Sequence, residues 1–197
     1  MTLKRDIELI YEIGCMRFVQ RTWKRFLNAD FQNVSEHTLR VIWISLILAK
    51  RENADINKII KMALVHDISE SRTGDVDYLS RQFCNRLDEK AIQEILQETS
   101  LEDFKKIWEE YEKRETIEAK IVKDADNLDA NFELKEQEVN GINVGKQWEK
   151  NREEKVFPRL FTNSAKEIWR AVQNSNPHDW HLNANNRFSS GDWKDKK

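Results

Sequence analysis

Four histidines occur in the chain, and two of them fall in segments rich in apolar residues. His37 and His66 lie in such segments, whereas His178 and His181 belong to a polar C-terminal stretch and are expected at the surface. A single histidine on a buried helix is usually a hydrogen-bonded core residue. His37 alone therefore does not indicate a metal site, and the residues near His66 decide whether these histidines could be metal ligands.

Acidic residues accompany His66 at short spacing. Asp67 is its direct neighbour, and Glu70 lies one turn further along if the segment is helical. Burying an imidazole and two carboxylates at the end of an apolar helix is unfavourable without a compensating charge, which a divalent cation supplies. The alternative is a solvated helix end. Asp126 weakens it, because this second acidic residue lies beside the inward-facing stripe of another predicted helix.

Two imidazoles and two carboxylates make a ligand set of two nitrogens and two oxygens. The set comprises His37, His66, Asp67 and Asp126. Such donors suit Mn, Co, Fe, Ni or Zn rather than Ca or Mg. Because the predicted core helices contain no further histidine, we expect one metal ion rather than a pair.

The elements that position these residues are predicted to be helices. Only 5 glycines and 2 prolines interrupt the chain, and apolar residues recur at helical spacing. Asn33 with Glu36 forms a capping pair, and Asp55 and Ser100 are further caps. We predict helices over about 5–27, 34–50, 56–66, 88–98, 100–111, 116–138 and 165–173, with an irregular stretch before the last. This indicates one all-α bundle of six or seven helices over residues 1–175 and a polar tail over 176–197.

Composition argues against a nucleic-acid-binding or a membrane-spanning protein. The formal net charge of −2 is not the basic footprint of a nucleic-acid-binding protein. The strongest apolar run, 41–49, is far shorter than the roughly 20 residues that span a bilayer. Cys15 and Cys84 form no CxxC pair, and no secretory signal precedes them. We expect a cytoplasmic protein with free, buried thiols and with no nucleic-acid or membrane partner.

The motifs together resemble a known superfamily. His37 in Ser-Glu-His, the pair His66-Asp67 with Glu70, and Asp126 in Lys-Asp-Ala-Asp resemble the HD superfamily of phosphohydrolases. The stretches 33–39 and 66–75 are similar to its 5′-deoxynucleotidase branch, and the similarity extends over about residues 10–140. It implies an HD-domain helical bundle, a homodimer, and metal-dependent removal of phosphate from deoxyribonucleoside 5′-monophosphates.

The resemblance also implies roles for single residues. The metal ligands would be His37, His66, Asp67 and Asp126. Glu70 would orient or activate the attacking water, and Asp75 would support the nucleotide or the catalytic geometry. An arginine upstream of the first histidine binds the phosphate in this family. Arg21, followed closely by a tryptophan, matches best, with Arg17 and Arg25 as rivals one helical turn away.

Substrate identity stays open at this point. Relatives often have prolines after the Gly-Asp that ends at Asp75, whereas residues 76–80 here read Val-Asp-Tyr-Leu-Ser and are expected to shape the pocket. Another phosphate ester, such as a phosphodiester or a nucleoside triphosphate, is one alternative. A non-catalytic nucleotide-binding regulator is the other. Glu70 argues against a regulator, because binding alone needs no water-orienting carboxylate. Trp180 and Trp193 in the tail receive no function.

Overall fold

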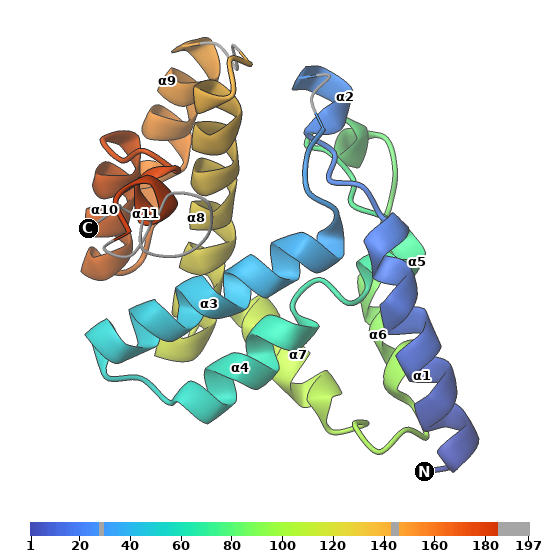
Figure 1. The fold of residues 1–197 in the computed structure, drawn as a ribbon. Helices are drawn as coiled ribbons and strands as arrows, with labels where there is room; N and C mark the ends of the chain where they lie inside the picture. Colours follow the sequence, from blue (N-terminus) through green and yellow to red (C-terminus); the bar gives the residue numbers. More distant parts are fainter. Residues whose placement is uncertain (28–29, 143–145, 185–197) are drawn as a thin grey trace, which may run out of the picture.

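The computed structural model describes residues 1–27, 30–142 and 146–184. These residues form helices and no strand, which confirms the all-α prediction (Figure 1). The α-helices are α1 (Leu3–Cys15), α2 (Lys24–Leu27), α3 (Val34–Glu52), α4 (Ile56–Val65), α5 (Glu70–Thr73), α6 (Asp88–Leu96), α7 (Phe104–Lys113), α8 (Ile117–Val139), α9 (Lys146–Lys155), α10 (Asn163–Gln173) and α11 (Asp179–Leu182). Short 3-10 turns lie at Met16–Phe18, Ser80–Gln82 and Phe157–Arg159. Within the described ranges, none of the helices is both long and apolar enough to cross a membrane.

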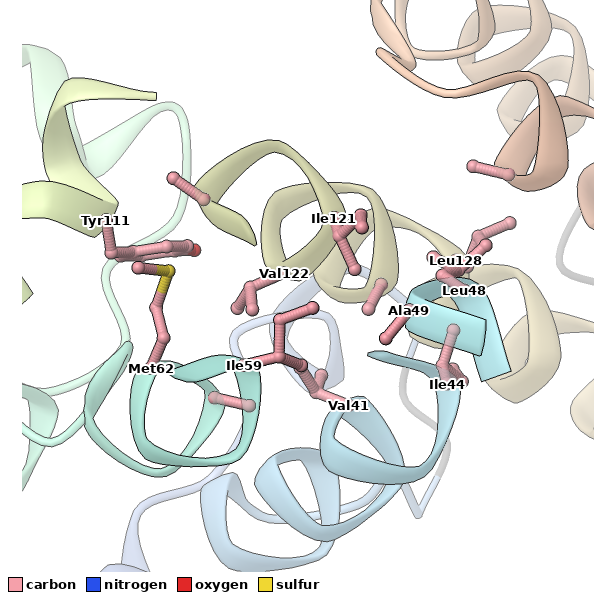
Figure 2. Close-up of a cluster of buried hydrophobic side chains, with 14 of the residues drawn as sticks. Val41, Ile44, Leu48, Ala49, Ile59, Met62, Tyr111, Ile121, Val122 and Leu128 are labelled. Atoms are coloured by element: carbon pink, nitrogen blue, oxygen red, sulfur yellow. The ribbon is translucent and has the colours of Figure 1, made fainter. Parts of the chain in front are cut away.

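Helix α3 packs against α8 and α4 at the centre of the molecule, and α7 and α10 pack on the other sides of this group (Figure 1). The main core lies between these helices, where Val41 and Leu48 of α3 meet Ile59 of α4 and Ile121 and Leu128 of α8 (Figure 2). All five side chains are buried. The residues of the site lie on helices whose positions this core determines.

Helix ends follow the sequence signals in several places. Asn33 and Glu36 form the predicted reciprocal capping box at the start of α3. Asp55 caps α4 by accepting from two backbone N–H groups. Helix α8 ends before Gly141, whose φ of +86° is a left-handed conformation that glycine adopts without strain. These signals locate the helices that carry His37, His66 and Asp126.

Three helix predictions were wrong in detail. The helix expected over 5–27 ends at Cys15, and the chain returns to helix only at α2. Helix α9 lies within the stretch expected to be irregular, because its strongly polar sequence shows little apolar periodicity. Helix α7 begins at Phe104 rather than after Ser100, since Ser100 instead donates to Asp6 from its backbone N–H and its hydroxyl.

The prediction of buried thiols was also wrong. Cys15 ends α1 and Cys84 lies in the loop before α6, and both are exposed. Of the two tail tryptophans, Trp180 is exposed and Trp193 lies outside the described residues.

Candidate metal centre

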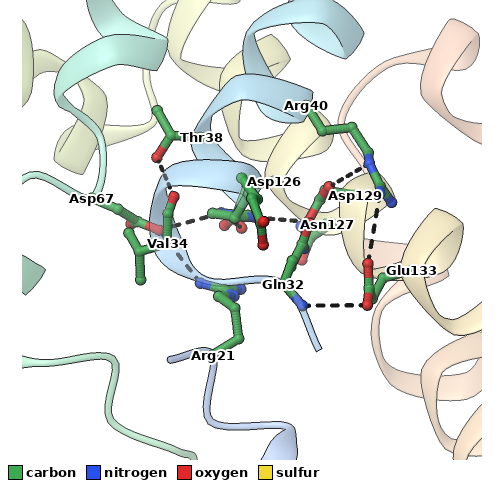
Figure 3. Close-up of polar contacts among 12 residues, drawn as sticks. Arg21, Gln32, Val34, Thr38, Arg40, Asp67, Asp126, Asn127, Asp129 and Glu133 are labelled. Carbon is green, nitrogen blue, oxygen red and sulfur yellow. Dashed lines mark hydrogen bonds and ion pairs between the residues drawn. The ribbon is translucent and has the colours of Figure 1, made fainter. Parts of the chain in front are cut away.

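Three helices bring the four predicted ligands to one point. His37 lies in the first turn of α3, and Asp126 lies in the middle of α8. His66 is the C-cap of α4, and Asp67 follows it in a turn that leads into α5. The helix predicted over 56–66 thus ends where expected, and Glu70 begins the separate short helix α5. The turn directs the Asp67 side chain towards α8 (Figure 3).

The donor atoms lie at distances that suit a single ion. His37 Nε2 is 3.3 Å from His66 Nε2, 3.3 Å from Asp67 Oδ2 and 3.4 Å from Asp126 Oδ1. One donor atom from each of the four residues lies within 4.8 Å of every other. Ligands at about 2.0–2.2 Å from a transition metal are separated by about this much. The donor set and its spacing therefore fit a divalent transition metal.

Hydrogen bonds on the outer side of each imidazole direct its Nε2 to this point. His66 Nδ1 donates to the carbonyl of Ala63 at 2.8 Å. His37 Nδ1 donates to Asp129 Oδ2 at 2.6 Å. With the Nδ1 proton engaged in this way in both rings, each Nε2 is the nitrogen left to present a lone pair to a metal.

Asp129 belongs to a buried polar network on α8. Gln32 donates to its Oδ2, and Arg40 Nε lies 3.5 Å from its Oδ1 (Figure 3). Arg40 also pairs with Glu136 at 2.9 Å. Asp129 is fully buried, so this network determines the position of the carboxylate behind His37.

The cluster strongly favours positive charge at its centre. Burial alone would lower the pKa of His37, but hydrogen bonds to Asp126, Asp129 and Asp67 raise this pKa well above its ordinary value. Burial opposes ionisation of Asp67, yet His66 and His37 hold its pKa well below the usual range. A metal ion would supply the same positive charge.

Glu70 lies beside this cluster with one oxygen free of hydrogen bonds. The residue is buried, and its Oε1 lies 3.3 Å from Arg86 Nη1. Its Oε2 is buried and has no partner among the described residues. Burial raises the pKa of Glu70 to about 9, and the nearby Asp67 and Asp75 add to the shift. An unpartnered buried carboxyl oxygen is suited to hold a water molecule.

Of the three candidate arginines, the structure brings only Arg21 to the cluster. Its Nη1 lies 3.3 Å from Asp75 Oδ2 and 3.6 Å from Asp67 Oδ2. Arg21 lies in an extended segment that pairs with the start of α3 through a bridge between Gln20 and Asn33.

The rival arginines point elsewhere, because the segment that carries them is not one helix. Arg17 is exposed and packs over Phe18. Arg25 pairs with Asp77 at 2.8 Å. Asp75 also accepts from the backbone N–H of Thr22 at 3.1 Å, so it holds the loop that carries Arg21.

A pocket of about 610 Å³ opens over the cluster. His66, Asp67, Glu70 and Asp126 line it, together with Arg21 and Asp75. Val76, Asp77 and Tyr78 also line it, in agreement with the expectation that residues 76–80 shape the pocket. Aromatic contacts surround it, with Phe26 stacked on Tyr78 at 5.4 Å and Trp23 against Trp148 at 4.9 Å. The pocket is large enough for a small phosphate ester.

Sequence reasoning missed several polar residues near the site. Asp129 lies three residues after Asp126, so helical spacing alone places both on one side of α8. Lys123 lies three residues before Asp126, and its Nζ is 2.7 Å from Asp126 Oδ2. Arg86 and Arg152 show no such signal, since one lies in a loop and the other on a helix that was not predicted. His178 is partly exposed and His181 is exposed, in line with the surface position expected of them, and the two rings hydrogen-bond to each other.

Comparisons with known proteins point to one family. The family model of the HD domain matches residues 13–169. A 5′-deoxynucleotidase HDDC2 from Dictyostelium discoideum is 38% identical over 120 residues, which cover 54% of this chain and 63% of that protein. The Bos taurus protein of the same name is 29% identical over 139 residues, 67% of each chain. The chain thus matches about two thirds of the length of these relatives.

A solved structure extends the likeness to the fold. A conserved hypothetical protein from Pyrococcus furiosus superposes with a TM-score of 0.69 and 26% sequence identity. The superposition covers 86% of this chain and 99% of the other.

Proposed function

Because the chain belongs to the HD domain family, we propose that it is a metal-dependent phosphohydrolase that removes phosphate from deoxyribonucleoside 5′-monophosphates. The relatives named 5′-deoxynucleotidase support this substrate class. The observation that carries the proposal is the convergence of four candidate metal ligands. Three of them line one pocket with Glu70, whose Oε2 has no partner among the described residues.

The proposed roles follow from the geometry of the site. His37, His66, Asp67 and Asp126 would hold a divalent metal, which when bound polarises a phosphate oxygen and lowers the pKa of a nearby water. Glu70 orients that water through Oε2 and accepts its proton as oxygen attacks phosphorus. The P–O5′ bond breaks, and the departing nucleoside oxygen takes up a proton.

Glu70 must be ionised to accept this proton. In the absence of metal its pKa is raised to about 9, mainly by burial. A cation beside Asp67 lowers this pKa, because a nearby positive charge favours the ionised carboxylate. The cluster therefore links metal binding to activation of the general base.

Arg21 donates hydrogen bonds to the phosphoryl oxygens, on which negative charge accumulates. Asp75 holds Arg21 through the 3.3 Å ion pair and fixes its loop through Thr22. Asp75 is therefore proposed to support the catalytic geometry through Arg21.

The test is phosphate release from ribo- and deoxyribonucleoside 5′-monophosphates by metal-stripped protein resupplied with Mn, Co, Zn, Fe, Ni or Mg. We expect metal-dependent release that favours deoxynucleotides and is lost in His66→Ala. Release from triphosphates or phosphodiesters alone would show that the substrate is one of these phosphate esters and not a monophosphate. Metal binding without release from any phosphate ester would favour the regulatory alternative.

Three finer properties belong to the same proposal. We propose Mn or Co as the first metals to test, since two imidazoles and two carboxylates suit both. A homodimer and a cytoplasmic location are predictions from the sequence. Sedimentation of the purified chain and localisation of a tagged chain test them.

A further inference from the structure

A buried arginine on α9 lines the pocket, and none of the proposed roles uses it. Arg152 is 7% exposed and lines the same pocket as Asp67 and Asp126. Its Nε donates to Asn131 Oδ1 at 3.0 Å, and its Nη2 donates to the carbonyl of Asn127 at 2.8 Å. Both acceptors lie on α8 and are neutral. These hydrogen bonds orient the guanidinium without balancing its charge.

The charge of Arg152 has no dedicated counter-ion. No ion pair joins it to a carboxylate within the described ranges. The acidic groups that act on it are Asp126 and Asp129, and both are already paired, Asp126 with Lys123 at 2.7 Å and Asp129 with His37 at 2.6 Å. A metal on Asp126 would weaken this compensation further. A buried cation in this position is unfavourable unless an anion joins it.

Two tryptophan rings pack near the Arg152 guanidinium. Its Cζ lies 5.7 Å from the centroid of Trp23 and 5.3 Å from that of Trp169. Trp23 also lines the pocket and follows Arg21 by two residues. Arg21 and Arg152 are close enough to act on each other electrostatically. Two guanidiniums therefore line one pocket together with His66, Asp67 and Asp126, and a phosphate group is an anion that two guanidiniums can bind.

We propose that Arg152 binds an anionic phosphate oxygen of the ligand in this pocket, on the phosphate monoester before hydrolysis and on inorganic phosphate afterwards. The proposal rests on the proposed function and adds a second phosphate-binding arginine from α9. We favour the phosphate over the nucleoside as the group bound by Arg152. The charged groups that act on Arg152 are Asp126, Asp129 and Arg21, and these lie where the proposed function places the phosphate.

The experiment measures ligand binding to metal-loaded protein by calorimetry, together with steady-state kinetics. Arg152→Met keeps the aliphatic stem against the tryptophans and removes the charge. We expect it to weaken binding of inorganic phosphate and to raise KM for the monophosphate by about tenfold, with kcat changed far less. Arg152→Lys should recover part of the loss. Binding of the phosphate-free deoxynucleoside should be unchanged.

Two controls separate ligand binding from a structural link between α8 and α9. Lys150→Met alters an exposed side chain on the same helix, whose one ion pair among the described residues is with Glu154 at 3.9 Å, and it should behave as wild type. Asn131→Ala removes one hydrogen bond that holds Arg152 but leaves the charge. It should lower the melting temperature more than it changes phosphate affinity.

Several results would overturn the proposal. If Arg152→Met binds phosphate as tightly as wild type, Arg152 is a structural link only. The same conclusion follows if phosphate affinity falls in proportion to the melting temperature in both Arg152→Met and Asn131→Ala. Weaker deoxynucleoside binding with unchanged phosphate binding would assign Arg152 to the nucleoside. Wild-type protein that hydrolyses no monophosphate would refute the proposed function, while its phosphate affinity relative to Arg152→Met would still test Arg152.

Discussion

Asp129→Asn should weaken metal binding without touching a metal ligand. The change keeps the shape of the side chain and removes the charge that accepts from His37 Nδ1 at 2.6 Å. Loss of such an outer partner reduces metal affinity by about 10- to 100-fold, which corresponds to about 1.4–2.7 kcal/mol. Competition with a coloured chelator measures the affinity, and calorimetry of the metal-free protein measures the stability.

Asp124→Asn is the matched control on the same helix. Asp124 is also fully buried, but it accepts from the backbone N–H groups of Phe161 and Thr162 and from the Thr162 hydroxyl, at the start of α10. Because hydrogen bonds to a charged group contribute about 1.5–3 kcal/mol each, we expect a loss of several kcal/mol with metal affinity unchanged. At about 2–4 °C per kcal/mol for a chain of this size, the melting temperature should fall by roughly 5–15 °C.

The pair separates metal positioning from stability. Metal affinity within twofold of wild type in Asp129→Asn would refute the argument that Asp129 positions His37. Equal loss of metal affinity in both variants would refute it as well, because the effect would then follow from a general loosening of α8.

Three further predictions concern the same site. Glu70→Gln should retain metal affinity, measured by chelator competition, and lose turnover by about 10²–10⁴-fold, and full activity would remove Glu70 from the mechanism. Arg21→Ala should raise KM for the monophosphate while Arg17→Ala, which alters an exposed side chain, leaves it unchanged; equal effects on KM in steady-state assays would contradict the assignment. Glu70 has a folded-state pKa raised to about 9 from 4.5, so its contribution to the stability of metal-free protein is fully present below about pH 4.5 and is lost as pH rises towards 9. Denaturant unfolding at several pH values gives the free energy of unfolding of wild type and of Glu70→Gln, and that of wild type should fall more steeply between about pH 4.5 and 9. The same pH dependence in both proteins would contradict the raised pKa.

Local signals predicted the helices that carry the metal cluster. Asn33 with Glu36 and Asp55 are caps whose hydrogen bonds involve residues within three positions, so the sequence contains the whole interaction. His37 and Asp126 lie on helices whose apolar residues recur at helical spacing. The family resemblance assigned the four candidate ligands to one site. Apolar periodicity alone does not, because their proximity depends on how α3, α4 and α8 pack against one another.

The remaining elements depend on contacts between distant segments. The extended segment at Arg21 pairs with Asn33 and is held by Asp75, which lies more than fifty residues away. Helix α9 is so polar that no apolar stripe reveals it. Its Arg152 nevertheless becomes buried, because Trp23 and Trp169 cover the guanidinium from two other segments. Such a position cannot be predicted from neighbours in sequence.

The division between predicted and missed elements coincides with two different tasks in the pocket. The well-predicted helices α3, α4 and α8 bring together the candidate metal ligands, whose geometry a rigid core must hold within about half an ångström if they bind a metal. Trp23 and Arg152, to which the sequence assigned no role, and residues 76–78, which were expected to shape the pocket, line the walls around the ligand. Those walls are built from side chains of separate segments that pack on each other, such as Phe26 with Tyr78. Exchanging residues 76–78 should therefore change which phosphate ester binds while metal affinity stays constant, because these residues lie outside the core helices α3, α4 and α8 that carry the candidate ligands.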